Sequence, residues 1–202
     1  VDKNKIADYV HSFGIDYGQN LYESASIGAF DGVTALEMSA AYGAYARGGY
    51  YIEPYSYTQI TYRDNGEIYV KATKKTKVCS KKTAKYINDI LVSAASEYHN
   101  LGTLEIGSTQ AAAKTGTTTI DSKIIKALDL NESAIMDSWA CIYTREYSIG
   151  LWYGYDTITQ RNYMVPLDGT LGRRRIIKKL VKQLFTTNSN LITSDESFTL
   201  DD

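Results

Sequence analysis

The sequence predicts an α+β fold in which antiparallel strands are packed between helices. Aromatic and β-branched residues dominate two adjacent segments, 137–143 and 147–156, and a turn at 144–146 separates them as in a β-hairpin. Apolar residues recur with helical spacing on both sides of this hairpin, at 81–97 and 173–185. With 202 residues, of which 44% are hydrophobic, the chain is long and apolar enough to form one core.

Two helices are predicted near the start of the chain. Residues 3–13 have a helical pattern that ends at Gly14, a residue type that commonly terminates helices. Thr34 and Glu37 have the spacing of a capping box, in which each side chain satisfies a backbone N–H group at the start of a helix. This second helix should continue to about Arg47 and stop at the glycine pair that follows.

Short strands follow these helices. Segments 50–53, 56–63 and 67–72 are strand candidates, separated by a proline and by the turn signal Asp64-Asn65-Gly66. We expect them to form a peripheral hairpin.

The helix predicted over 81–97 is amphipathic and has Ser80 as its N-cap. Its lysines near the start are interpreted as a solvated first turn rather than as a binding patch. Its apolar face is predicted to comprise Ala84, Ile87, Ile90, Leu91, Ala94 and Ala95.

The last helix is predicted over 173–185. Its basic start, at 173–175, admits a nucleic-acid or membrane-surface interpretation, but the apolar face favours a helix that covers a sheet. From 186 to 202 the chain becomes polar and acidic, and we expect a flexible tail after a domain that spans 1–185. The predicted apolar face consists of Ile176, Ile177, Leu180, Val181 and Leu184.

The most informative segment is the tetrapeptide Lys114-Thr115-Gly116-Thr117, which follows three alanines in a predicted strand. Because side chains alternate along a strand, Thr115 and Thr117 should share one face, and Lys114 and Gly116 the other. Beside a cleft, the two hydroxyls and the adjoining backbone N–H groups would hold a carboxylate or a developing oxyanion, and Lys114 would add positive charge. Gly116 would let another element approach closely. The alternative is an edge strand whose lysine discourages aggregation and whose threonines merely suit a pleated sheet.

Composition excludes several other classes of protein. The net charge of −1 argues against a general nucleic-acid binder, and the 18 tyrosines are spread over the chain as sheet packing would require. No apolar run approaches the length of a membrane span, and no signal peptide opens the chain. Cys79 and Cys141 have no metal-ligand spacing, so no metal or other cofactor is predicted, and whether they pair is left open. Cys141 is interpreted as a small buried hydrophobe.

Several segments, in order along the chain, resemble the C-terminal part of a penicillin-binding protein transpeptidase domain, most like that of the bifunctional class A peptidoglycan synthases. The resemblance extends from Lys5 to about Tyr155, and 113–118 resembles the third catalytic motif of that family. It implies the fold of the serine β-lactamases and transpeptidases. The segments that carry it are 26–30, 33–42, 46–54, 113–118, 137–139 and 150–156.

The chain departs from this family in its motifs. No serine is followed by lysine three residues later or by asparagine two residues later, so the Ser-x-x-Lys and Ser-x-Asn motifs are missing. Tyr86-Ile87-Asn88 and Tyr98-His99-Asn100 match a variant of the second motif, but both lie too close before Lys114 and are interpreted as accidental. We expect the chain to begin after the missing motifs. Residues 120–136 are longer than the family's usual connection and should include a short helix; this insertion either modulates access to the cleft or has no role in the chemistry.

The resemblance implies acyl transfer through a serine ester. Lys114 would tune the proton network, and the Thr117 backbone N–H would be one oxyanion donor, which makes these two residues the catalytic candidates. Thr115 and Thr117 would bind a substrate carboxylate, and Gly116 and Thr118 belong to the same substrate-binding strand. Asp137, Trp139 and Trp152 are assigned to the sheet scaffold.

The implied function is that of part of a peptidoglycan D,D-transpeptidase whose nucleophile lies outside this chain, so the isolated chain should be inactive. Its partners would be the peptidoglycan stem peptide, β-lactam antibiotics and the N-terminal part of the same domain, with no nucleic acid and no membrane contact by this segment. The location would be the extracytoplasmic face of a bacterial cell membrane, with any anchor outside the chain. Two alternatives remain: a noncatalytic cell-wall binding module, and a β-lactamase or D,D-carboxypeptidase relative.

Overall fold

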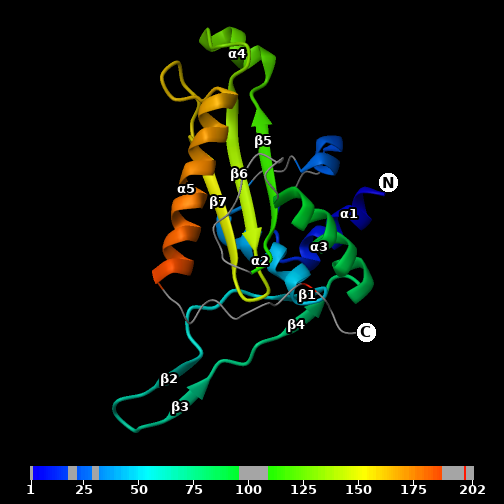
Figure 1. Cartoon of the computed structure of the whole chain (residues 1–202), viewed down its shortest axis with the longest axis vertical. Coiled ribbons are helices and arrows are strands. Elements are labelled where there is room, and N and C mark those ends of the chain that lie inside the picture. The colour runs from blue at the N-terminus through cyan, green and yellow to red at the C-terminus, as the bar shows by residue number, and fades with distance from the viewer. Residues whose placement is uncertain (1, 18–21, 29–31, 96–108, 188–197, 199–202) are drawn as a thin grey trace.

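A computed structural model describes residues 2–17, 22–28, 32–95, 109–187 and 198 of the chain (Figure 1). Its helices are α1 (Lys3–Ser12), the 3₁₀ helix η1 (Glu23–Ile27), α2 (Ala35–Ala46), α3 (Lys81–Ala95), α4 (Ser122–Leu128) and α5 (Pro166–Thr187). Its strands are β1 (Tyr50–Ile52), β2 (Gln59–Thr61), β3 (Ile68–Val70), β4 (Lys75–Lys77), β5 (Ala112–Thr119), β6 (Ile135–Tyr143) and β7 (Ser148–Gly154).

The central sheet is antiparallel and has the order β5-β6-β7. Thr115 pairs with Ala140, which pairs in turn with Leu151. The predicted β6–β7 hairpin is confirmed, and its turn is held by Thr144, whose hydroxyl oxygen accepts hydrogen bonds from the backbone N–H groups of Glu146 and Tyr147 at 3.3 and 3.1 Å. Strand β6 begins two residues earlier than predicted.

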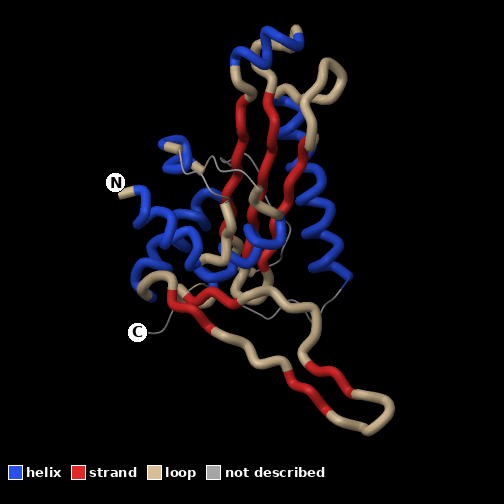
Figure 2. Tube along the Cα trace, turned by 180° about the vertical axis from the view of Figure 1, so that it is seen from behind, coloured by secondary structure: helices blue, strands red, loops and turns tan. Residues whose placement is uncertain are grey.

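Helices cover both faces of this sheet. Figures 1 and 2 show α5 along one face, while α2 and α3 lie on the opposite side. This arrangement confirms the predicted α+β fold with an antiparallel sheet between helices. The core under α5 consists of Ala111, Ala113, Ala140, Ile142, Ile177, Val181 and Phe185. On the other face the core contains Leu91, Ala112, Tyr143 and Phe198.

Helix α5 begins at Pro166, seven residues before the predicted start at Arg173. Proline is favoured in the first turn, where its missing N–H group costs no hydrogen bond. Glycines 169 and 172 occupy the early sheet-facing positions, so the apolar spacing that predicted the helix is absent there. The predicted apolar face was also too wide, because Ile176 and Leu180 are 40% and 37% exposed.

Helix α2 starts with the predicted capping box. The Thr34 hydroxyl accepts from the Glu37 backbone N–H at 3.2 Å, and the Thr34 N–H donates to the Glu37 carboxylate at 2.7 Å. The helix is fixed to the sheet by the Ser148 hydroxyl, which donates to the Ser39 carbonyl at 2.6 Å. Gly150 lies beneath its first turn, where a Cβ atom would come within 2.3 Å of the Ala35 carbonyl oxygen.

Helix α3 has the predicted N-cap, because the Ser80 hydroxyl accepts from the Thr83 N–H at 3.0 Å. The prediction that Ile90 faces the core is wrong, since this side chain is 62% exposed. Asn88 is instead fully buried. A polar side chain can be buried at this position because it has hydrogen-bond partners on two other elements, as described below.

Strands β1 to β4 form two small antiparallel pairs. The predicted hairpin is β2–β3, and Figure 1 shows it extending away from the body of the molecule. Strand β4 was not predicted; it pairs with β1, with Tyr51 opposite Thr76. Its Lys-Thr-Lys sequence has no apolar alternation that would predict a strand. The strand forms because it pairs with β1, which lies more than 20 residues earlier in the chain.

The connection between β5 and β6 contains the predicted short helix, α4. Asp121 caps it by accepting from the Lys123 N–H at 2.7 Å. Ile120, Leu130 and Ala134 form a small core of their own around the helix. Figure 1 shows α4 at one end of the central sheet.

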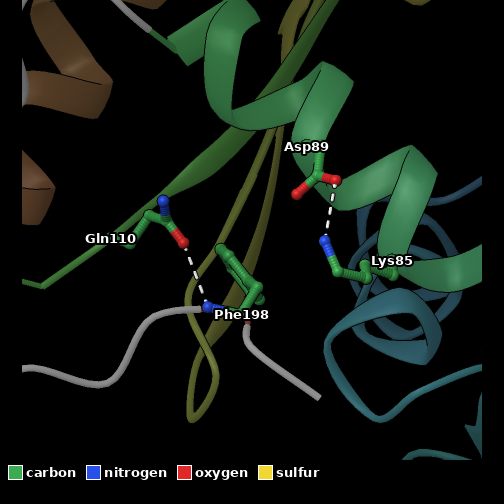
Figure 3. A network of polar contacts seen from close by, with 4 residues as sticks. All are labelled: Lys85, Asp89, Gln110 and Phe198. Carbon is green, nitrogen blue, oxygen red and sulfur yellow. Dashed lines mark hydrogen bonds and ion pairs between the residues drawn. The ribbon is translucent and has the colours of Figure 1, made fainter. Parts of the chain in front are cut away.

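The predicted tail, 186–202, lies mostly outside the described residues. Thr186 and Thr187 belong to α5. Phe198 is 5% exposed and packs edge-on against Tyr143, with ring centroids 5.5 Å apart. Its backbone N–H donates to the Gln110 side-chain oxygen at 3.0 Å (Figure 3). The same view shows Lys85 paired with Asp89 on the exposed face of α3, at 3.1 Å.

Candidate functional site

The Lys-Thr-Gly-Thr segment lies in β5, an edge strand of the central sheet as far as the chain is described. Lys114 and Thr117 are exposed, and Thr115 and Gly116 are half-buried. The Lys114 ammonium group donates to the carbonyl oxygen of Thr115, which holds the charge along the strand edge. The lysine is therefore accessible at the surface and not enclosed in the core.

The side chains of β5 alternate as predicted. Ala113, in the core under α5, shares its face with Thr115 and Thr117. Ala112, in the core under α3, shares its face with Lys114 and Gly116. The motif therefore offers hydroxyls on the α5 side and an ammonium group on the α3 side of one strand edge.

Arg173 on α5 contacts the same strand, and the sequence prediction missed it. One guanidinium nitrogen, Nη1, donates to the Gly116 carbonyl oxygen at 2.8 Å and to Thr117 Oγ1 at 2.9 Å. Arg173 is 2% exposed, although the sequence placed it in the basic start of the predicted helix and not on its apolar face. The sequence signal was its place four residues before Ile177, an apolar residue of the predicted sheet-facing side, which puts Arg173 one turn earlier on the same side.

The close approach of another element that was predicted at Gly116 is not seen within the described residues. Among the described residues, a Cβ atom there would meet only Trp139 Cβ, at 3.5 Å, which is an ordinary contact. Thr118 lies opposite Asp137 in the sheet and is half-buried. The carboxylate of Asp137 accepts a hydrogen bond from the Trp152 indole at 2.7 Å, which agrees with a scaffold role for both residues.

The structure describes the first of the two Tyr-x-Asn segments but not the second. In the first, Asn88 is buried and bonded to the Tyr143 hydroxyl at 2.7 Å and the Tyr45 carbonyl at 3.2 Å, so it joins α3 to the sheet and to α2. Asn88 is buried, whereas Lys114 is exposed, so the two side chains do not share a surface. The second, 98–100, lies outside the described residues.

Both cysteines are free thiols, and Cys141 is buried in β6 opposite Lys114. Burial raises the pKa of this thiol, and the positive charge of Lys114 opposes the rise. The residue is the small buried hydrophobe that was predicted. Within the described ranges, no group of three or more His, Cys, Asp or Glu side chains is arranged to hold a metal.

Cys141 should make folding stability depend on pH in the alkaline range. Burial raises its pKa from 9.0 to about 12, so below pH 9 both states keep the proton, and at higher pH the unfolded chain loses it first. The free energy of unfolding should therefore fall by about 1.4 kcal/mol per pH unit from this group between those values. Urea unfolding of Cys141→Ala should give a shallower alkaline slope than the parent, and an unchanged slope would contradict the assignment.

A pocket of about 290 Å³ lies away from the motif, between the end of β7 and the first turns of α5. It contains none of the predicted site residues. Its lining consists of Tyr153, Tyr155, Tyr163, Met164, Asp168, Leu171, Gly172 and Arg175. Over the described part of the chain, no helix is both long enough and apolar enough to span a membrane.

Comparison with known proteins agrees with this geometry. The model of the penicillin binding protein transpeptidase domain family matches residues 2–166. Penicillin-binding protein 1A/1B of Bacillus subtilis is 31% identical over 159 residues, which cover 76% of this chain but 17% of that protein. Penicillin-binding protein 1A of Streptococcus pneumoniae is 28% identical over 181 residues, 84% of this chain and 24% of that protein. The chain therefore spans less than a quarter of these relatives.

Solved structures show the same fold. Penicillin binding protein 3 of Mycobacterium tuberculosis, complexed with ampicillin, aligns over 97% of this chain and 48% of its own, with a TM-score of 0.63 and 15% identity. The ceftriaxone acyl-enzyme complex of penicillin-binding protein A from the same organism aligns over 91% of this chain and 43% of its own, with a TM-score of 0.61 and 17% identity. The fold is thus that of the penicillin-binding transpeptidases. On the family match and the geometry of β5 together, the chain belongs to the penicillin binding protein transpeptidase domain family.

Proposed function

We propose that this chain supplies one wall of a peptidoglycan D,D-transpeptidase site and that the attacking serine belongs to polypeptide outside it. The observation that carries the proposal is the edge of β5 that pairs with no other described strand, on which Lys114 and Thr117 are exposed together. Alternate backbone N–H groups of an edge strand point away from the sheet and are available to a ligand. Membership of the transpeptidase family supports the assignment of this edge to acyl transfer.

In the proposed reaction, a serine Oγ attacks the carbonyl carbon between the two terminal D-alanines of a stem peptide. A C–O bond forms, the C–N bond breaks, and the terminal D-alanine leaves after its nitrogen accepts a proton. An amine of a neighbouring stem peptide then attacks the ester, which restores the serine and forms the cross-link. This chemistry belongs to the extracytoplasmic face of the cell membrane, where peptidoglycan is assembled.

Each site residue has a proposed role in this reaction. Lys114 would move protons and supply positive charge, and the Thr117 N–H would donate to the oxyanion. Thr115 and Thr117 would bind the carboxylate of the terminal D-alanine, while Gly116 and Thr118 complete the strand along which the peptide lies. β-Lactam antibiotics, which carry a comparable carboxylate, would acylate the same serine.

A fluorescent penicillin tests the proposal. A protein that carries this chain together with the Ser-x-x-Lys and Ser-x-Asn segments should become covalently labelled, and an excess of unlabelled ampicillin should prevent labelling. The 202-residue chain alone should stay unlabelled, because it contains neither motif. A folded whole domain that is not labelled would favour the noncatalytic binding module, and covalent labelling of the chain alone would show that the nucleophile has been misplaced.

A further inference from the structure

Arg173 is a buried cation beneath the Thr117 end of the motif. It is 2% exposed, and its Nε has no hydrogen-bond partner among the described residues. Burial lowers the pKa of the guanidinium, and no acidic group of the described chain opposes that shift. A buried charge without a counter-charge is costly, so an anion nearby would stabilise it.

The hydrogen bond from Arg173 determines what the Thr117 hydroxyl can do. A hydroxyl has a single hydrogen and two acceptor lone pairs. Nη1 donates to Oγ1 at 2.9 Å and so occupies a lone pair, which leaves the hydroxyl hydrogen for another acceptor. Because the donor is charged, it also polarises the hydroxyl and strengthens it as a donor. Thr117 is exposed, so this hydrogen is within reach of a ligand.

The fold holds Arg173 in this position through close packing of α5 on the sheet. Gly169 and Gly172 face the strands, and a Cβ atom on Gly172 would come within 2.6 Å of the Tyr153 ring. The carbonyl oxygen of Gly169 accepts from the Ser138 hydroxyl at 2.8 Å. Thr117, Ser138 and Tyr153 pair across the three strands, so this part of α5 follows one row of the sheet.

We propose that Arg173 is a positioning residue for the carboxylate of the acyl donor: acting through Thr117, it keeps the hydroxyl a donor and makes the edge of β5 prefer an anionic ligand to a neutral one. This inference rests on the proposed function, which places a carboxylate at Thr117. It differs from a purely structural role for Arg173, in which the guanidinium only ties α5 to the Gly116 carbonyl. A structural role would not distinguish a charged ligand from a neutral one.

The test compares a penicillin that has a free carboxylate with its methyl ester, on the protein that carries the whole domain. In Arg173→Gln, the second-order rate constant of acylation should fall about 10- to 100-fold for the acid and less than about 3-fold for the ester. Arg173→Lys should give an intermediate acid-to-ester ratio, because it keeps the charge but loses the planar fork. Arg174→Gln, an exposed neighbour, is the matched control and should change neither rate.

A double-mutant cycle supplies a second criterion. In a Thr117→Val background, which has no hydroxyl to orient, Arg173→Gln should reduce the acid rate less than about 3-fold further. Equal slowing of acid and ester, or full additivity with Thr117→Val, would overturn the inference.

Should Arg173→Gln fail to fold, the acid-to-ester ratio of Arg173→Lys decides: an unchanged ratio overturns the inference. If the parent protein is acylated by neither compound, the proposed function itself fails, whereas a parent that is acylated with an Arg173-independent ratio overturns this inference alone.

Discussion

Replacing Lys114 by alanine should slow acylation by a fluorescent penicillin about 10²- to 10⁴-fold, the usual contribution of a positioned proton-transfer group. Lys114 is exposed at the edge of β5, and within the described residues its ammonium group donates one hydrogen bond, to the neighbouring carbonyl of Thr115. Its removal therefore takes little from the fold. Nearly all of the expected loss should appear in the rate of the chemical step.

The measurement is the second-order rate constant of labelling in the protein that contains the whole domain. Lys126→Ala is the control, because that lysine is also exposed but lies on α4 and not on β5. It should be labelled at the parent rate. Labelling of Lys114→Ala within about 3-fold of the parent would exclude Lys114 from proton transfer, while thermal unfolding confirms that both variants fold.

Replacing Asn88 by alanine should lower the free energy of unfolding by about 2 to 4 kcal/mol, the largest stability effect we expect from a polar side chain here. Asn88 is fully buried. It accepts from the Tyr143 hydroxyl at 2.7 Å and donates to the Tyr45 carbonyl at 3.2 Å. Truncation leaves both groups buried without this partner and opens a cavity between α3, the sheet and α2.

Urea unfolding gives the measurement, and the adjacent residue gives the control. Asp89 lies on the exposed face of α3, where its side chain is 57% exposed and pairs with Lys85. Asp89→Ala should cost less than about 0.5 kcal/mol, since exposed helical ion pairs contribute little. Tyr143→Phe should be intermediate, because it removes one of the two bonds. Equal midpoints for the Asn88 and Asp89 variants would mean that the buried network does not form.

The parts of the fold that were predictable depend on short-range patterns. The β6–β7 hairpin follows from two aromatic strands that flank a turn, and the start of α2 follows from Thr34 and Glu37, three residues apart. Strand β5 and its alternation are predictable for the same reason. In each case, the residues that determine the element lie within or beside it.

The rest depends on partners that are remote in sequence. Arg173 and Gly116 are 57 residues apart, and Asn88 and Tyr143 are 55 apart. From composition and spacing, an arginine or an asparagine in a helix is expected at the surface. Burial of either side chain is favourable only when a hydrogen-bond partner is present, and here that partner is remote in sequence. Ile90 is the opposite case, an apolar residue that was predicted to be buried but is exposed. Helical spacing alone cannot tell which edge of an apolar face meets the core.

If Arg173 acts as proposed, the ligand preference of β5 depends on the side-chain volume at the sheet-facing positions of α5. Any side chain at Gly172 would have to displace the Tyr153 ring or lift the helix, and Arg173 would move with it. A homologue with an intact Lys-Thr-Gly-Thr segment but a bulkier residue at that place would then differ in susceptibility to acidic inhibitors. The spacing Gly169-x-x-Gly172-Arg173 is therefore the feature to compare when inhibitor profiles diverge among sequences whose motifs are identical.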